Sequence, residues 1–115
     1  MNETMSCRRG ALLDTWSGHD WQDGVQVESL DDLCNLTVCT ENSTYEITLI
    51  AAHSGEVLVR GGRFFEELTP ARLAGSSLGG SFLKVRGIYV GFNMEINLDG
   101  RSIITSRVRS ISIKI

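Results

Sequence analysis

The stretch that decides the fold runs from Ile88 to Leu98 and reads Ile-Tyr-Val-Gly-Phe-Asn-Met-Glu-Ile-Asn-Leu. Every second side chain in it is large and apolar, and the positions between them hold mostly polar or small residues. This two-residue period is that of a strand with one face buried and the other in water, and it leaves little room for a helix. The run therefore predicts a continuous strand over Ile88–Leu98.

The turn after this run decides which side chains of the last strand are buried. Asp99-Gly100 has the composition of a turn. A two-residue turn at these positions would bring Arg107 and Arg109 onto the apolar face, where unpaired charges are costly. A three-residue loop over residues 98–100 would shift the pairing by one and turn both arginines outward. We therefore expect the three-residue loop.

The last strand changes its pattern partway along. Ile104 and Val108 mark one face, whereas the apolar residues after Ser110 mark the other. A β-bulge near Arg109–Ser110 would reconcile the two halves; alternatively, the apolar end pairs with another subunit. An exposed apolar strand end is an edge that needs covering. The candidate oligomer interface is therefore formed by Ile111, Ile113 and Ile115.

Shorter strand patterns come earlier in the chain. Strand signals begin at Val25, and apolar residues alternate over Tyr45–Ala51. The alternation breaks at Ser54-Gly55 and then resumes at Val57, which is typical of a β-hairpin. A further short strand is expected over Ser81–Arg86.

One helical signal interrupts the strand patterns. Thr69 followed by Pro70 resembles a helix cap with proline in the first turn, so we expect a short helix over Ala71–Leu73. The chain as a whole is then all-β, with at most one or two short helical turns. Glycine-rich corners favour a small antiparallel β-barrel or sandwich of about six to eight strands. We expect a single β domain over residues 25–115, preceded by an N-terminal arm or partly ordered tail over residues 1–24.

Length, apolar runs and cysteines indicate the compartment. The 115 residues suffice for one domain, and no apolar run approaches the ~20 residues that cross a bilayer. The apolar stretch Ala11–Leu13 is too short for a secretory signal. The three cysteines, Cys7, Cys34 and Cys39, form an odd set that fits a reducing compartment better than a disulfide framework. We expect a cytoplasmic protein with no membrane partner.

Motifs for catalysis or metal binding are weak. Cys34 and Cys39 form one close cysteine pair, whereas structural zinc sites usually need two such pairs. On a strand, their odd spacing would point the two thiols to opposite faces. Ser54 follows His53, but no motif supplies an orienting acid. The sequence therefore predicts no catalytic residue, no metal and no cofactor.

The charge distribution is the most unusual feature of the composition. Residues 1–59 hold two basic and ten acidic residues, and residues 60–115 hold nine basic and four acidic ones. Outward arginines could neutralise phosphates, and a neighbouring aromatic ring could stack on bases. Against this, the isoelectric point of about 5.3 is low for a nucleic-acid-binding module, and the two halves could pair inside one fold. The candidate binding residues are Arg60, Arg63, Phe64, Arg86, Arg107 and Arg109.

These patterns are compatible with three classes of function. The leading hypothesis is a non-catalytic binding module that acts through self-association or a protein partner, because the C-terminal strand is apolar and needs covering. The alternative is a small nucleic-acid-binding β-barrel that uses an arginine-rich face. A small enzyme without a recognisable motif is the third.

Overall fold

The computed structural model describes residues 23–78 and 82–114, and this part of the chain consists mainly of strands. The strands are β1 (Gly24–Gln26), β2 (Asn35–Thr40), β3 (Thr44–Ala51), β4 (Glu56–Gly61), β5 (Phe65–Ser77), β6 (Leu83–Val85), β7 (Gly87–Tyr89), β8 (Asn93–Leu98) and β9 (Arg101–Lys114). The helical elements in the described residues are two single 3₁₀ turns, η2 (Val27–Ser29) and η3 (Ala52–Ser54). The all-β prediction is confirmed. Residues 1–22 of the expected arm and Ile115 of the expected interface lie outside the described residues.

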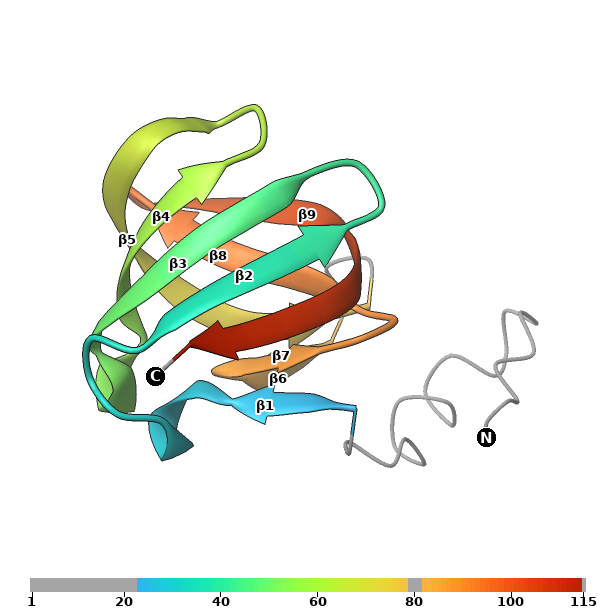
Figure 1. Ribbon diagram of the computed structural model, residues 1–115. Helices are drawn as coiled ribbons and strands as arrows, with labels where there is room; N and C mark the ends of the chain where they lie inside the picture. The colour runs from blue at the N-terminus through green and yellow to red at the C-terminus, as the bar shows by residue number, and fades with distance from the viewer. Residues whose placement is uncertain (1–22, 79–81, 115) are drawn as a thin grey trace.

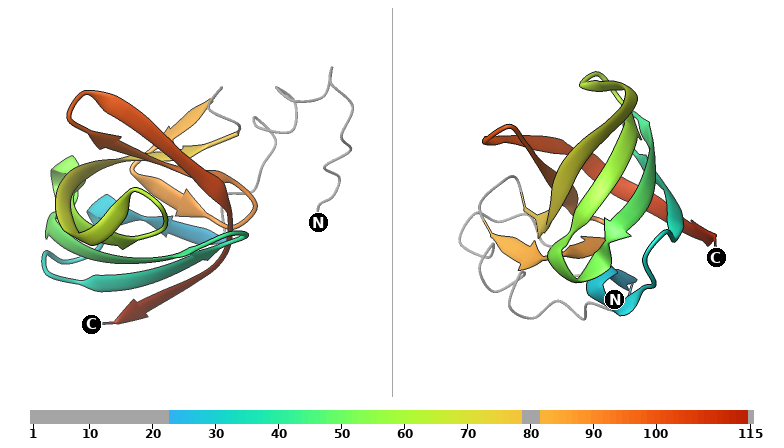
Figure 2. Two further views of the ribbon diagram at one scale, coloured as in Figure 1. Left: turned by 90° about the horizontal axis from the view of Figure 1, so that it is seen from above. Right: turned by 90° about the vertical axis from the view of Figure 1, so that its left-hand side faces the viewer.

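The larger sheet closes on itself into a barrel. Its strand order is β4-β3-β2-β9-β8-β5-β6, and β5 also pairs with β4, so six strands form a ring from which β6 extends. All of these pairs are antiparallel. β1 and β7 form a separate two-stranded sheet beside the ring (Figures 1 and 2). The expectation of a small antiparallel barrel or sandwich is therefore confirmed, in the form of a closed ring, and the described residues form nine strands where six to eight were expected.

Alternate side chains from every strand of the ring fill the interior. This burial follows the two-residue period of each strand, since successive side chains point to opposite faces of a sheet. A smaller apolar cluster around Phe92 joins Leu78 to Tyr89. The fully buried side chains of the main core include Leu36, Val38, Ile47, Leu49, Val59, Phe65, Leu73, Met94 and Ile96.

The strand predicted over Ile88–Leu98 is interrupted. β7 ends at Tyr89, the chain turns over residues 90–92, and β8 begins at Asn93. The corner is held on β9, because the Gly91 N–H donates to the Val108 carbonyl (2.9 Å) and the Val108 N–H donates to the Phe92 carbonyl (2.9 Å). The first residues of the run therefore leave the ring to pair with β1, while the rest form β8 within it.

The three-residue loop predicted over residues 98–100 is wrong. Leu98 pairs directly with Arg101, so Asp99 and Gly100 form a two-residue turn. Both have positive φ, 51° and 79°, which is the conformation of a type I′ hairpin turn. The twist of this turn matches the twist of the strands it joins, and it is favoured for that reason.

A β-bulge, and not a longer loop, shifts the register between β8 and β9. Glu95 pairs with Ile104, but Asn93 pairs with Arg107, so Thr105 and Ser106 both lie opposite Met94. The extra residue shifts the register by one and leaves Arg107 exposed. Its outward orientation was therefore predicted correctly for a different reason.

The second irregularity of β9 lies where the sequence predicts it. Cys39 of β2 pairs with Ser110, whereas Thr40 pairs with Val108, so Arg109 is the extra residue. Beyond this bulge, residues 110–114 pair with β2 of the same chain. The predicted bulge near Arg109–Ser110 is confirmed.

The helix predicted over Ala71–Leu73 is wrong, because these residues lie inside β5. The Leu73 N–H donates to the Gly55 carbonyl, so the backbone groups of Leu73 point toward β4. Backbone groups of successive residues point alternately to the two edges of a strand, so the Pro70 nitrogen points to the opposite edge of β5, the edge that faces β8. β8 pairs with β5 only from Arg72 onward, which leaves that edge open at Pro70. A proline is tolerated there because no hydrogen bond of the sheet is lost.

Ile104 does not share a face with Val108, although the sequence predicts that it does: it is 44% exposed, because the bulge at Thr105–Ser106 lies between the two residues. Two other expectations about local structure hold. β3 and β4 form the predicted hairpin, with η3 and Gly55 at its turn. β6 lies within the described part of the strand expected over residues 81–86. No helix within residues 23–78 and 82–114 is long and apolar enough to cross a bilayer.

Candidate functional site

The C-terminal half of β9 has one paired edge and one open edge. Cys34 and Thr40 direct their backbone groups to the β3 side, since the Leu49 N–H donates to the Cys34 carbonyl and the Thr40 N–H to the Ser43 carbonyl. Backbone groups alternate between the two edges of a strand, so the odd-numbered residues of β2 face β9. Their partners are Ser110, Ser112 and Lys114.

The N–H and C=O groups of Ile111 and Ile113 therefore point away from β2. Within the described residues, no strand pairs with this side of β9 beyond Val108. We call it the β9 edge. In both views of Figure 2 the end of β9 projects from the barrel, and the Ser112, Ile113 and Lys114 side chains are exposed.

A groove of about 360 Å³ runs beside the β9 edge. The Val90 N–H donates to the Asp23 carbonyl (2.8 Å), and this contact holds the start of β1 as the opposite wall. Ile111 is half-buried against the core, whereas Ile113 is 40% exposed. We call this space the edge groove; it is lined by Asp23, Gly24, Val90, Arg109, Ser110, Ile111 and Ile113.

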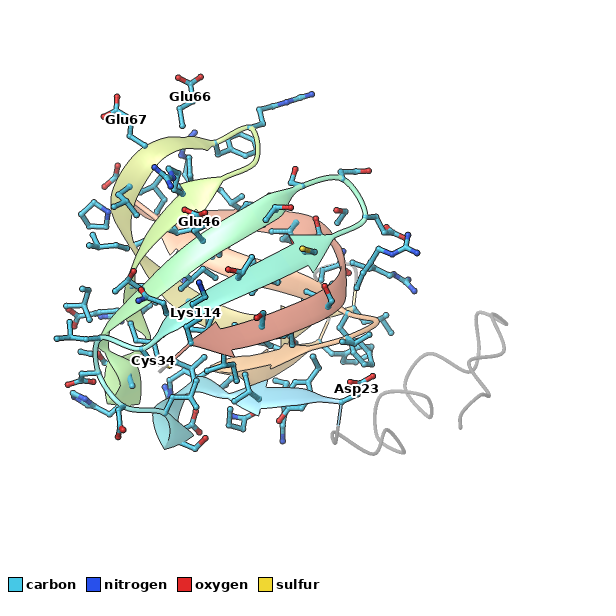
Figure 3. All side chains as sticks on the ribbon, in the orientation of Figure 1. Asp23, Cys34, Glu46, Glu66, Glu67 and Lys114 are labelled. Carbon is cyan, nitrogen blue, oxygen red and sulfur yellow. The ribbon has the colours of Figure 1, made fainter. Side chains whose placement is uncertain are left out.

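The edge groove carries one charge of each sign. Asp23 and Arg109 both line it, and within the described residues no ion pair involves either of them. Figure 3 shows Asp23 at the beginning of β1, at the end of the molecule away from Lys114. The edge groove can therefore offer a partner an acid, a base, an apolar surface and unpaired backbone groups.

A second groove, of about 440 Å³, lies at the end of the barrel where two hairpin turns meet β9. Its walls come from the β2–β3 turn, the β4–β5 turn and the bulged part of β9. Burial raises the pKa of Tyr45, which lies on its floor, and a hydrogen bond with Ser43 partly offsets this effect. We call it the turn groove; it is lined by Asn42, Ser43, Tyr45, Arg63, Phe64, Ile103, Ile104, Thr105 and Ser106.

The predicted binding residues are distributed over several places. Arg63 and Phe64 line the turn groove, and Arg109 lines the edge groove. Arg107 is exposed on β9. The two remaining arginines, Arg60 and Arg86, are engaged elsewhere.

Arg60 and Arg86 pair with the acidic half of the chain. Arg60 forms an ion pair with Glu46 on the neighbouring strand β3. The Arg86 Nε lies 3.8 Å from the Glu28 carboxylate. Both pairs join a glutamate of the acidic first half to an arginine of the basic second half, so part of the charge asymmetry is satisfied inside the fold. The structure therefore does not gather the predicted arginines on one face.

The oligomer residues, in contrast, are brought together with residues that the sequence analysis missed. Ile111 and Ile113 share the edge groove with Asp23 and Val90, which are far away in the sequence. Asn42 and Ile104 of the turn groove were missed as well. No local pattern links these positions, because the grooves arise only when the ring closes.

The cysteines and other metal-ligand residues form no centre in the described part of the chain. Within it, no group of three His, Cys, Asp or Glu side chains is placed to hold a metal ion. Cys34 is buried, and its thiol donates to the Lys114 carbonyl at 3.4 Å (Figure 3). This contact fastens the end of β9 to the start of β2.

The three comparisons with known proteins give no assignment. No protein-family model, no curated protein and no solved structure matches this chain. The grooves and the β9 edge are therefore the basis for inferring function.

Proposed function

We propose that the chain is a non-catalytic binding module that associates with a second copy of itself through the β9 edge. The observation that carries this proposal is the pair of backbone N–H and C=O groups at Ile111 and at Ile113 that no strand of the described chain covers. An uncovered strand edge is a template for pairing with another strand.

The β9 edge is self-complementary. Two copies of residues 111–113 can lie antiparallel about a twofold axis through Ser112. Ile111 of one copy then lies opposite Ile113 of the other, and each such pair exchanges two N–H···O=C bonds. The symmetric dimer therefore contains roughly four new backbone hydrogen bonds, each worth about 0.5–1.5 kcal/mol.

The side chains of the edge groove add to this pairing. Ile111 and Ile113 lie opposite Val38 and Leu36 of β2, so they are on the inner, apolar face of the sheet. The partly exposed Ile113 side chain can bury its apolar surface against the second copy. An interface between identical copies presents the same patch twice, so the Ile113 side chain of each copy can pack against Ile111 of the other.

The magnitudes indicate a weak, concentration-dependent dimer. The hydrogen bonds contribute about 2–6 kcal/mol, whereas association costs an estimated 4–15 kcal/mol in lost translational and rotational freedom. Burial of the apolar surface of Ile111 and Ile113 must supply the rest. We expect an interface at the small end of the range for specific complexes.

Light scattering over a concentration series tests the proposal. The mass of the wild-type chain should rise from monomer toward dimer as the concentration increases. Ile113→Lys should keep the chain monomeric, because it places a like charge from each copy in the edge groove. Thr44→Lys is the matched control: Thr44 is exposed on β3, away from the β9 edge, so this variant should associate like the wild type.

Two results would overturn the proposal. A wild-type chain that stays monomeric at millimolar concentration excludes self-association as its function. Equal association of the wild type and both lysine variants places the contact on another surface. Circular dichroism of each variant checks that it is folded before its mass is compared.

A further inference from the structure

We propose that the turn groove binds a nucleoside phosphate, with its base stacked on Phe64 and its phosphate on Arg63. The ligand is either a free nucleotide or one unit of a single strand, since both present the same chemistry. This site lies on different residues from the β9 edge.

The turn groove has a firmly built wall. The Ser106 hydroxyl donates to the Thr40 hydroxyl (2.8 Å) and accepts from the Asn42 N–H (3.0 Å). The Thr40 hydroxyl in turn donates to the Ser43 carbonyl (3.1 Å). These bonds fasten the β2–β3 turn to the bulge of β9, so the wall is held in place without a ligand. Its volume of about 440 Å³ is within the roughly 300–1,000 Å³ of small-molecule sites.

The groove exposes apolar surface that the core does not need. Phe64 is 57% exposed and Ile104 is 44% exposed, although both side chains are large and apolar. They come from different elements, the β4–β5 turn and β9, yet line one hollow. An exposed aromatic ring beside such a hollow is suited to stacking on a flat base, which is worth about 1–3 kcal/mol per base.

The polar groups of the groove favour an anion. Among the described residues that line it, Arg63 alone is charged. Within residues 23–78 and 82–114, neither its guanidinium nor the Asn42 side-chain amide has a hydrogen-bond partner. The nearby carboxylates of Glu66 and Glu67 project outward from β5, away from the barrel (Figure 3). A phosphate on Arg63 would therefore meet no lining acid.

These groups together select the ligand class. Inorganic phosphate alone would not use the exposed ring, and a purely apolar ligand would not use Arg63. The Asn42 amide offers one donor and one acceptor side by side, which suits the edge of a base. A base within a duplex cannot stack on Phe64, so the ligand must be unpaired.

Titration of the full chain with fluorescent nucleotides tests the proposal. The probes are fluorescent adenosine monophosphate, fluorescent uridine monophosphate, and single strands of six adenosine or six uridine nucleotides. Each probe is titrated at a low and at a high salt concentration. Phe64→Ala should weaken binding by roughly 5- to 150-fold, the equivalent of the stacking energy of one base. Arg63→Gln should weaken binding and reduce its salt dependence, since it removes one phosphate contact.

Matched controls keep the outcomes distinct. Arg72→Gln removes an arginine that is exposed on β5 outside both grooves, so it should leave affinity unchanged. Ile113→Lys should also bind normally, whether or not the chain self-associates. Equal affinity for a monophosphate and a six-nucleotide strand identifies a free nucleotide as the ligand, and binding of the strands alone identifies single-stranded nucleic acid; both support the proposal.

Three results would overturn it. The first is no binding of any probe at low salt, where phosphate contacts are strongest. The second is full competition by inorganic phosphate at the same concentration, which would show that the base is not bound. The third is affinity that Phe64→Ala and Arg63→Gln leave unchanged.

Discussion

Replacement of Thr105 by valine tests how the bulge of β9 is stabilised. Thr105 is 5% exposed and lies at the position where the register of β8 and β9 shifts. Its hydroxyl accepts from the Met94 N–H at 3.0 Å and donates to the Ser106 carbonyl at 2.6 Å. Valine has nearly the same shape and the same preference for strands, so Thr105→Val removes the hydroxyl with little change in packing.

The expected loss of stability follows from the buried Met94 N–H. Met94 is fully buried, and a buried backbone donor that loses its partner costs about 1–3 kcal/mol. The melting temperature of a domain near this size falls by roughly 3–8 °C per kcal/mol. Thr105→Val should therefore lower the free energy of unfolding by about 1–3 kcal/mol and Tm by at least a few degrees.

Urea denaturation and thermal melting measure both quantities. Thr44→Val is the matched control, because Thr44 is exposed on β3 and its hydroxyl makes only a 3.7 Å contact with the Cys39 sulfur. This control should stay within about 0.5 kcal/mol of the wild type. If Thr105→Val costs no more than Thr44→Val, the hydroxyl does not hold the bulge and the reasoning is refuted.

Two further predictions concern β5 and Tyr45. Gly75→Ala should destabilise the protein more than Gly100→Ala. Both glycines have a positive φ, 148° at Gly75 and 79° at Gly100. A Cβ added at Gly75 would lie 2.0 Å from the Lys84 carbonyl oxygen, whereas a Cβ added at Gly100 would meet nothing within 4 Å. Gly100→Ala should cost about 1–2 kcal/mol in backbone conformation alone, and equal losses in urea denaturation would contradict the close approach of β6. Burial raises the pKa of Tyr45, so the folded state holds the phenol proton more tightly than the unfolded state, and stability should fall as pH rises above the ordinary tyrosine value of 10.0. Tyr45→Phe should show a shallower fall above about pH 10 in denaturant titrations; an unchanged slope would contradict this assignment.

The barrel could be predicted because its pattern is local. The alternation that ends at Leu98 identifies β8, and its buried positions Met94 and Ile96 are those that the sequence analysis placed on the apolar face. The helix expected at Ala71–Leu73 failed because the signal of Thr69-Pro70 is also compatible with an open strand edge. Whether residues 71–73 form a helix or a strand depends on where β8 begins to pair with β5, and no residue near Pro70 in the sequence indicates that position.

The register and the grooves could be predicted only in part. The cost of burying an unpaired charge predicts that Arg107 faces outward, but a longer loop and a β-bulge satisfy that condition equally well. The bulge is stabilised by the hydroxyl of Thr105, and nothing in the local pattern distinguishes this threonine from others on strands. Asp23 and Ile113 meet in one groove because β9 curls around the barrel (Figure 1), and such a contact depends on the closed ring.

Amide hydrogen exchange along β9 tests the self-association of the β9 edge most directly. The amides of Ser112 and Lys114 face β2, so they should be protected at every protein concentration. The amides of Ile111 and Ile113 face the open edge, so they should exchange rapidly in dilute monomer and become protected as the concentration rises. Protection of these two amides in the monomer, or rapid exchange in a sample that light scattering shows to be dimeric, would contradict the account.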